Sequence, residues 1–200
     1  PTAPDQLRRC VEDPGFRGLK VHGSIHRMAV DDERMYPLFA VMQSFRLPVL
    51  MHSGGMGVRP YGDDFTRVHR FDAVANAFPD MPLILGHAGR MDHAMTAELL
   101  RKHPQVYADI SSNIGRTKAA AGWPIRELMA NVAGWAGSTE RILFGSDFPL
   151  YDQGVTIAEL DAAAPRSGDP FTQGDLRAVL ESNGETFLDR IPSIFTTPSA

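Results

Sequence analysis

The segment 81–87, with the sequence MPLILGH, decides the fold class of this chain. It is apolar almost without interruption, and its proline stands at the start, where a missing backbone N–H costs a strand least. An apolar run of this kind is typical of a strand that is covered on both faces in a parallel sheet. The segment 47–52, LPVLMH, repeats the pattern. Both segments therefore predict strands of a parallel sheet, and each ends in a histidine.

Three further short apolar runs extend this sheet in both directions along the chain. The five strands are expected at residues 18–22, 48–52, 82–87, 106–110 and 141–145. Helical patterns fill the intervals and follow the last strand, at residues 31–45, 67–78, 94–102, 124–135, 155–162, 172–181 and 184–189. Strand and helix alternate at spacings that suit either a barrel or an open doubly wound sheet. An α/β protein with a parallel sheet is predicted, and the spacing alone leaves the two architectures open.

Composition indicates one ordinary globular domain. Of 200 residues, 43% are hydrophobic and 22% are charged, and we expect the domain to cover residues 1–190 with a flexible tail at 191–200. The net charge of −4 without a Lys/Arg cluster argues against nucleic acid as a partner. No apolar run approaches the ~18 residues of a membrane span, so no membrane role is expected. The lone Cys10 favours a packing role and a cytoplasmic location. Because the chain starts at Pro1, an upstream portion is expected.

Polar side chains end the predicted strands. They are His22, His52, His87, the pair Asp109 and Ser111, and Asp147. The carboxyl ends of parallel strands meet at one rim, where ligands bind in such folds. Imidazole and carboxylate groups suit Zn²⁺ or a similar divalent ion. Taken singly, each histidine could instead hydrogen-bond a loop carbonyl, and only their convergence favours an active site.

The motifs around these residues resemble a known family. They are GLKVH (18–22), PVLMHSG (48–54), FPDMPLILGHAG (78–89), VYADIS (106–111) and RILFGSDFP (141–149). Together they are similar to the amidohydrolase-related (amidohydrolase 2) family, and their order matches its barrel strands four to eight. The resemblance implies a (β/α)8 TIM-barrel type of fold, incomplete in this chain, over roughly residues 15–190.

The resemblance also assigns roles. It implies that His52 is a metal ligand from the fifth strand, that Asp147 is a ligand that also handles the proton of a bound water, and that His87 is the acid/base. One divalent ion is expected, Zn with Mn as an alternative. The family carries a His-x-His or Glu-x-His pair on its first strand, and this sequence contains no such pair.

The expected activity is metal-dependent hydrolysis of an ester, lactone or amide. The alternatives are non-oxidative decarboxylation of an aromatic or unsaturated carboxylic acid, and a truncated binding module without turnover. We expect a small-molecule substrate, a carboxylic acid or lactone, contacted by His22, Ser111 and Asn113; a homo-oligomer is possible. Lys20 is expected to be buried and paired, with a two-metal site around a carboxylated lysine as the alternative. The remaining histidines are expected at the surface or at helix ends: His26, His69, His93 and His103.

Overall fold

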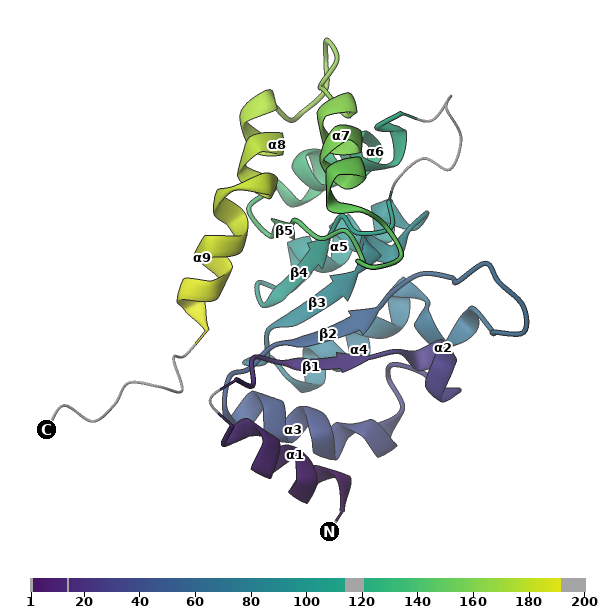
Figure 1. Ribbon diagram of the computed structural model, residues 1–200, viewed down its shortest axis with the longest axis vertical. Helices are drawn as coiled ribbons and strands as arrows, with labels where there is room; N and C mark the ends of the chain where they lie inside the picture. The colour runs from purple at the N-terminus through teal and green to yellow at the C-terminus, as the bar shows by residue number, and fades with distance from the viewer. Residues whose placement is uncertain (1, 14, 114–120, 192–200) are drawn as a thin grey trace, which may run out of the picture.

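A five-stranded parallel sheet forms the centre of the molecule. The computed structural model describes residues 2–13, 15–113 and 121–191. Within them the strands pair in the order β1-β2-β3-β4-β5 (Figure 1). Their bounds are β1 Leu19–Val21, β2 Val49–His52, β3 Leu83–Gly86, β4 Val106–Asp109 and β5 Ile142–Leu143. All five predicted strands are confirmed, and each is a little shorter than expected.

Helices connect the strands and follow the last one. The α-helices are α1 Ala3–Val11, α2 Gly23–His26, α3 Tyr36–Ser44, α4 Phe71–Ala77, α5 His93–Lys102, α6 Trp123–Ala136, α7 Gln153–Ala162, α8 Gln173–Leu180 and α9 Ser182–Arg190. Short 3₁₀ turns are η1 Glu33–Met35, η2 Asp64–Thr66, η3 Val68–Arg70 and η4 His87–Gly89. The predicted helices are all present. The expected flexible tail at 191–200 lies outside the described residues except for Ile191.

Several helix ends follow local sequence rules. Asp32, not Asp31, caps η1 by accepting from the Arg34 backbone N–H. Pro37 lies in the first turn of α3, where proline is tolerated. Gly137 ends α6 in the left-handed conformation that glycine adopts without strain. No helix in the described ranges is long and apolar enough to cross a membrane.

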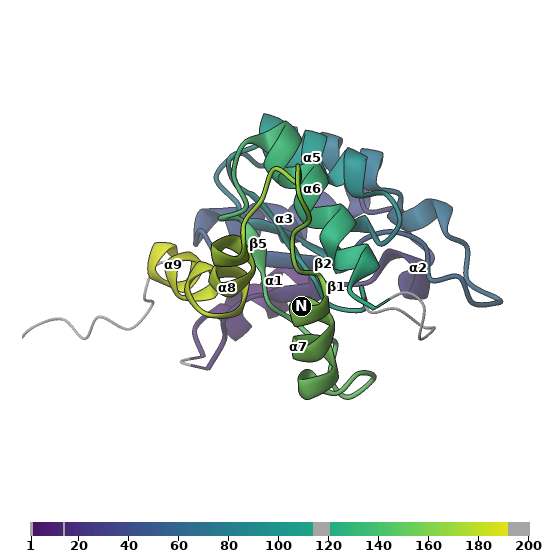
Figure 2. The same cartoon turned by 90° about the horizontal axis from the view of Figure 1, so that it is seen from above.

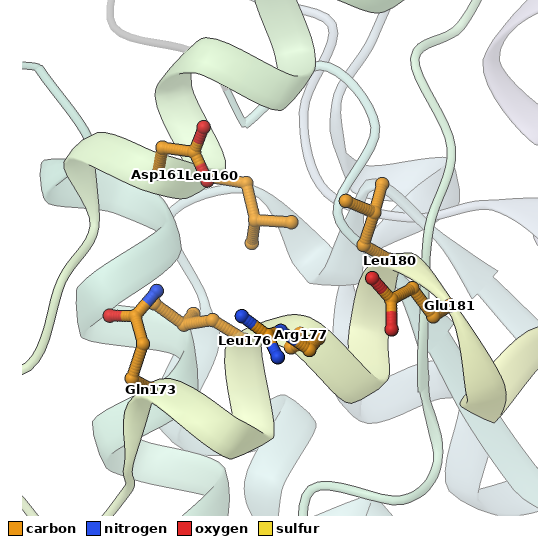
Figure 3. A pocket seen from close by; sticks show the side chains of 7 residues that line it. All are labelled: Leu160, Asp161, Gln173, Leu176, Arg177, Leu180 and Glu181. Carbon is orange, nitrogen blue, oxygen red and sulfur yellow. The ribbon is translucent and has the colours of Figure 1, made fainter.

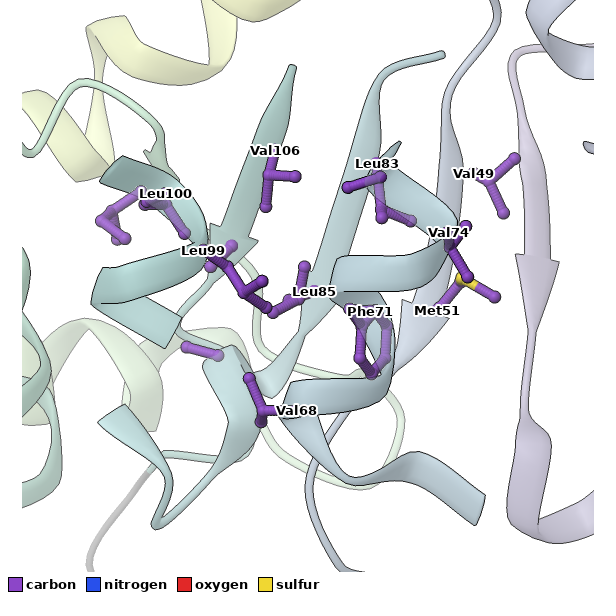
Figure 4. Close-up of a cluster of buried hydrophobic side chains, with 14 of the residues drawn as sticks. Val49, Met51, Val68, Phe71, Val74, Leu83, Leu85, Leu99, Leu100 and Val106 are labelled. Atoms are coloured by element: carbon purple, nitrogen blue, oxygen red, sulfur yellow. The ribbon is translucent and has the colours of Figure 1, made fainter. Parts of the chain in front are cut away.

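The outer face of the sheet carries the main core. Alternate strand residues such as Val49, Leu83 and Val106 point to this face and pack against α4 and α5 (Figure 4). Phe71 of α4 and Leu100 of α5 are fully buried there. Figure 2 shows α5 and α6 side by side on this side of the strands. This layer is a continuous apolar core.

The inner face of the sheet carries a smaller apolar cluster. Ile84, Tyr107 and Leu143 form it together with Phe187 of α9. The rings of Tyr107 and Phe187 meet edge to face with centroids 4.7 Å apart. In the part of the chain that the structure describes, β1 and β5 each pair with one neighbour only. The inner face beyond this cluster therefore presents polar side chains rather than a second apolar core.

Candidate active site

Three histidines meet at the carboxyl ends of β1, β2 and β3. Strand alternation and register place His22 and His52 side by side on the inner face. Their rings stack with centroids 4.0 Å apart and an interplanar angle of 15°. The ring of His87 meets His52 edge to face, with centroids 4.7 Å apart. The structure thus brings together the three histidines that the sequence placed at the rim.

These imidazoles have lone pairs that could bind a metal. Burial, reinforced by the neighbouring His87 and His22, lowers the pKa of His52 to about 2. Burial and the charge of Lys20 lower the pKa of His22 to about 4. Both rings are therefore neutral near pH 7. Among the described residues, His52 Nε2 and His22 Nδ1 are buried without a hydrogen-bond partner, and an orphaned neutral imidazole nitrogen is the donor that Zn²⁺ prefers.

Asp147 follows β5 on the same rim. Its Oδ2 accepts a hydrogen bond of 2.9 Å from the hydroxyl of Ser112. Its charge opposes the fall in pKa of both His87 and Lys20. Asp147 has a left-handed backbone, φ 68°, and precedes the cis bond Phe148-Pro149. The structure therefore places Asp147 at the same end of the sheet as the histidines, in contact with Ser112.

His87 is hydrogen-bonded to the last residue of β4 and to the segment that follows it. Its backbone N–H donates to Asp109 Oδ1 over 2.9 Å. Its ring Nδ1 lies 2.8 Å from the hydroxyl oxygen of Ser111 and 3.2 Å from the backbone oxygen of Ser111. Its carbonyl accepts from Asn113 Nδ2 over 2.7 Å. Burial lowers the pKa of His87, although the carboxylates of Asp109 and Asp147 oppose this.

A second buried histidine lies behind this segment. His93 Nε2 is 3.4 Å from Asn113 Oδ1, and its Nδ1 is 3.7 Å from a carboxylate oxygen of Glu127. His93 is the first residue of α5 and His103 follows its last residue, so the expected helix-end positions of both are confirmed. Both side chains are nevertheless buried, at 1% and 6% exposure, and His103 pairs with Asp72 over 2.7 Å. The expected exposure of His26 and His69 is confirmed.

Lys20 lies on the inner face, two residues before His22. Its ammonium lies 3.3 Å from the point where a Cβ on Gly86 would be, so the missing side chain of Gly86 makes room for it. Desolvation lowers the pKa of Lys20, and Asp109 and Asp147 oppose this. The side chain is exposed, so the predicted burial of Lys20 is wrong, and the charges of Asp109 and Asp147 act on its ammonium.

The rim stores backbone strain. His87, Ala88, Arg90, Ser112 and Asp147 all have positive φ, between 46° and 68°. A left-handed conformation at a residue other than glycine costs on the order of 1–3 kcal/mol and persists only where surrounding contacts enforce it. Such outliers cluster at functional sites in proteins. Their concentration around the predicted catalytic residues favours an active site here.

Within the described ranges, no three His, Cys, Asp or Glu side chains lie close enough together to hold a metal ion by themselves. This agrees with the lack of a first-strand ligand pair in the sequence. A cavity of about 220 Å³ lies apart from the rim, between α7 and α8 (Figure 3). Leu160, Leu176 and Leu180 line it together with charged side chains, and it shares no residue with the histidine cluster.

Comparison with known families agrees with this geometry. The amidohydrolase family model matches residues 1–190. The chain belongs to the amidohydrolase family. Solved structures of similar fold include a 2,6-dihydroxybenzoate decarboxylase complexed with 2,6-dihydroxybenzoate, at TM-score 0.66 and 15% identity. Its match covers 94% of this chain and 66% of the other.

Two further structures extend the comparison. An uncharacterised TIM-barrel protein from Bordetella bronchiseptica matches at TM-score 0.63 and 22% identity, over 91% of this chain and 63% of the other. The 5-carboxyvanillate decarboxylase of Sphingomonas paucimobilis matches at TM-score 0.63 and 14% identity, over 95% of this chain and 63% of the other. The chain thus shares the fold of a TIM-barrel protein and spans just under two thirds of the length of these three structures. A search of curated proteins found no match.

Proposed function

We propose that this chain forms the catalytic half of a divalent-metal hydrolase that activates water for attack on an ester, lactone or amide carbonyl. The observation that carries the proposal is the orphaned, neutral Nε2 of His52 next to the ring of His87. A buried nitrogen without a partner costs folding free energy, so its persistence calls for a ligand.

His52 and Asp147 would hold the ion together with ligands that this sequence does not contain. Imidazole and carboxylate donors favour Zn²⁺, and Mn²⁺ is the alternative because one structure of similar fold, a dihydroxybenzoic acid decarboxylase, contains bound manganese. A bound divalent ion lowers the pKa of a water molecule toward ~7 and polarises a carbonyl oxygen. Asp147 accepts the water proton, and the hydrogen bond from Ser112 orients its carboxylate for this task.

His87 transfers a proton at the reacting centre. Buried contacts with Ser111 fix the position of its ring. His22 contacts the substrate from β1. Ser111 and Asn113 remain predicted substrate contacts, although their polar atoms bond to the His87 segment in this structure. The substrate is a small carboxylic acid or lactone, and Lys20 supplies a nearby positive charge.

Non-oxidative decarboxylation is the second candidate. It is favoured because several structures of similar fold are decarboxylases of hydroxybenzoates, and one of them holds 2,6-dihydroxybenzoate. The same residues would serve it, with His87 delivering a proton to the carbon that loses carbon dioxide. Incubating the full-length protein with aryl esters, lactones and hydroxybenzoates separates the two. Acid release without carbon dioxide supports hydrolysis, carbon dioxide release supports the second candidate, and no turnover with any of them contradicts both.

Elemental analysis tests the metal assignment. In the full-length protein, His52→Ala should lose the bound ion, whereas His69→Ala, which changes an exposed histidine of η3, should keep it. One tightly bound ion per chain in the His52→Ala protein would show that His52 is not a ligand.

A further inference from the structure

The contacts around Asp109 go beyond what the metal and the substrate require. Asp109 is 9% exposed and lies at the end of β4. A single oxygen, Oδ1, accepts hydrogen bonds from the backbone N–H groups of His87 and Ser111, each over 2.9 Å, and from the hydroxyl of Ser111. Three donors thus converge on one carboxylate oxygen. Asp109 thus links the backbone of His87 to Ser111, the residue that contacts the His87 imidazole.

The direction of these hydrogen bonds can be assigned from donor and acceptor chemistry. A carboxylate oxygen only accepts, so the single proton of the Ser111 hydroxyl points to Asp109. The Ser111 oxygen then presents a lone pair to His87 Nδ1, 2.8 Å away. The backbone oxygen of Ser111, 3.2 Å from the same nitrogen, is also an acceptor only. Two independent acceptors face Nδ1, and Nδ1 must carry the proton.

We propose that Asp109, acting through the Ser111 hydroxyl, fixes His87 in the tautomer with its proton on Nδ1, so that Nε2 is presented as a proton acceptor. Asp109 is then a positioning residue. The inference rests on the proposed function in one respect, the role of His87 in proton transfer. The assignment of the tautomer stands on the hydrogen-bond geometry alone.

This arrangement gives the proton transfer an order. Asp147 takes the proton of the attacking water, whereas Nε2 of His87 accepts a proton from a substrate hydroxyl and later gives it to the leaving group, while Nδ1 keeps its own proton throughout. The positive ring that forms in between is stabilised by the carboxylate of Asp109 through the Ser111 oxygen. Asn113 contributes by holding the His87 carbonyl, which prevents the ring from turning away.

Nitrogen NMR tests the tautomer directly. The full-length protein, metal-free and labelled with ¹⁵N-histidine, is measured at mildly alkaline pH, where the ring is neutral, and the His87 signals are assigned with a His87→Asn sample. We expect a protonated Nδ1 and an unprotonated Nε2. A protonated Nε2 in the wild-type protein overturns the proposal and leaves the proposed function standing. This NMR measurement is made on the wild-type protein, so it does not depend on whether variants at Asp109 or Ser111 fold.

The hydrogen bonds from Asp109 through the Ser111 hydroxyl to His87 are called the relay below. Kinetics of the metal-loaded enzyme test its role. Ser111→Ala should lower kcat by roughly 10- to 100-fold with little change in KM, as is usual when a residue that orients a catalytic group is lost. It should also raise the fraction of the Nε2–H tautomer. Ser111→Thr keeps the hydroxyl and should restore most of both. Ser44→Ala, which removes a hydroxyl that bonds to Val41 O in α3, is the matched control and should change neither.

The outcomes separate the two proposals. An unchanged kcat in Ser111→Ala overturns the relay if His87→Asn still abolishes turnover. An unchanged kcat in His87→Asn contradicts the proposed function itself. A loss of kcat in Ser111→Ala that Ser111→Thr does not restore, with the tautomer unchanged in both, assigns Ser111 to substrate contact or packing and also overturns the relay.

Discussion

The outer face of the sheet and the rim at its carboxyl end have opposite effects on the stability of the fold. On the outer face, side chains such as Phe71 and Leu85 are fully buried and apolar. At the rim, His52 and His22 keep buried nitrogens without partners, and His87 and Asp147 have left-handed backbones. The first region lowers the free energy of the folded state, and the second raises it. Stability and chemistry are therefore separable in this molecule, and substitutions in the two regions should affect different measurements.

The largest difference between the effect on activity and the effect on stability is expected at His87. In the full-length enzyme, His87→Asn should lower kcat by roughly 10²- to 10⁴-fold, the range for losing a general acid/base. The metal content should stay the same. Stability should be unchanged or slightly higher, because asparagine tolerates positive φ better than most residues. Kinetics, elemental analysis and chemical denaturation measure the three quantities. Parallel loss of metal and activity would make His87 a ligand.

Phe71→Ala should show the reverse behaviour. Removing a fully buried ring from the outer core leaves a cavity and should cost about 3–5 kcal/mol of unfolding free energy. The kcat of the protein that remains folded should change little. Denaturant titration and active-site titration check this. Val155→Ala, at a side chain that is 50% exposed, is the control and should change stability by less than about 0.5 kcal/mol.

Gly86→Ala tests the boundary between the two regions. Its new methyl group would lie 3.1 Å from the Met51 backbone oxygen and 3.3 Å from Lys20 Nζ. The backbone oxygen has little freedom to move, so overpacking should cost roughly 1–3 kcal/mol. The displaced ammonium should also lower kcat. If the denaturation and the kinetics of the variant both match the wild type, the missing side chain of Gly86 does not make the room that Lys20 needs.

The smallest effect is expected at Asp72, far from the rim. Hydrogen bonds from His103 and Lys102 lower the pKa of Asp72 below its ordinary value of ~3.9. Its stabilisation is therefore complete above that value and disappears as the pH falls through the lower pKa of the folded state. The stability difference between wild type and Asp72→Asn should shrink on acidification below pH ~4, as followed by denaturation at several pH values. A difference that grows instead would contradict the pairing.

Patterns of local origin could be predicted from the sequence. The apolar runs of β2 and β3 identified their strands, and Gly137 marked the end of α6, because strand burial and helix termination leave signals within a few residues. The convergence of His22, His52 and His87 followed from the rule that parallel strands end at one rim. The resemblance to the amidohydrolase family then gave the barrel type, which spacing had left open.

The errors and omissions arise from contacts between distant segments. His93 starts α5 as the sequence indicated, but its burial beside Glu127 and Asn113 comes from the packing of α5 against α6 and had no local signal. The burial of His103 depends on Asp72, which lies in α4. The left-handed backbone at His87 has no sequence signal, because neither a glycine nor an asparagine occupies that position. The only hint of the Asp109 contacts was the alternation of Asp109 and Ser111 at the end of β4.

The order of the strands has a consequence for how the molecule opens and folds. Each strand pairs with its neighbour in sequence, as Leu19 does with Val49, Val49 with Leu83 and Leu83 with Val106, so each pairing closes a loop of a few tens of residues. Loop-closure entropy changes slowly with length, and the successive pairings cost similar amounts. The sheet can therefore grow or dissolve one strand at a time from its edges. Amide hydrogen exchange should be fastest at β1 and β5 and slowest at β3, which has neighbours on both sides.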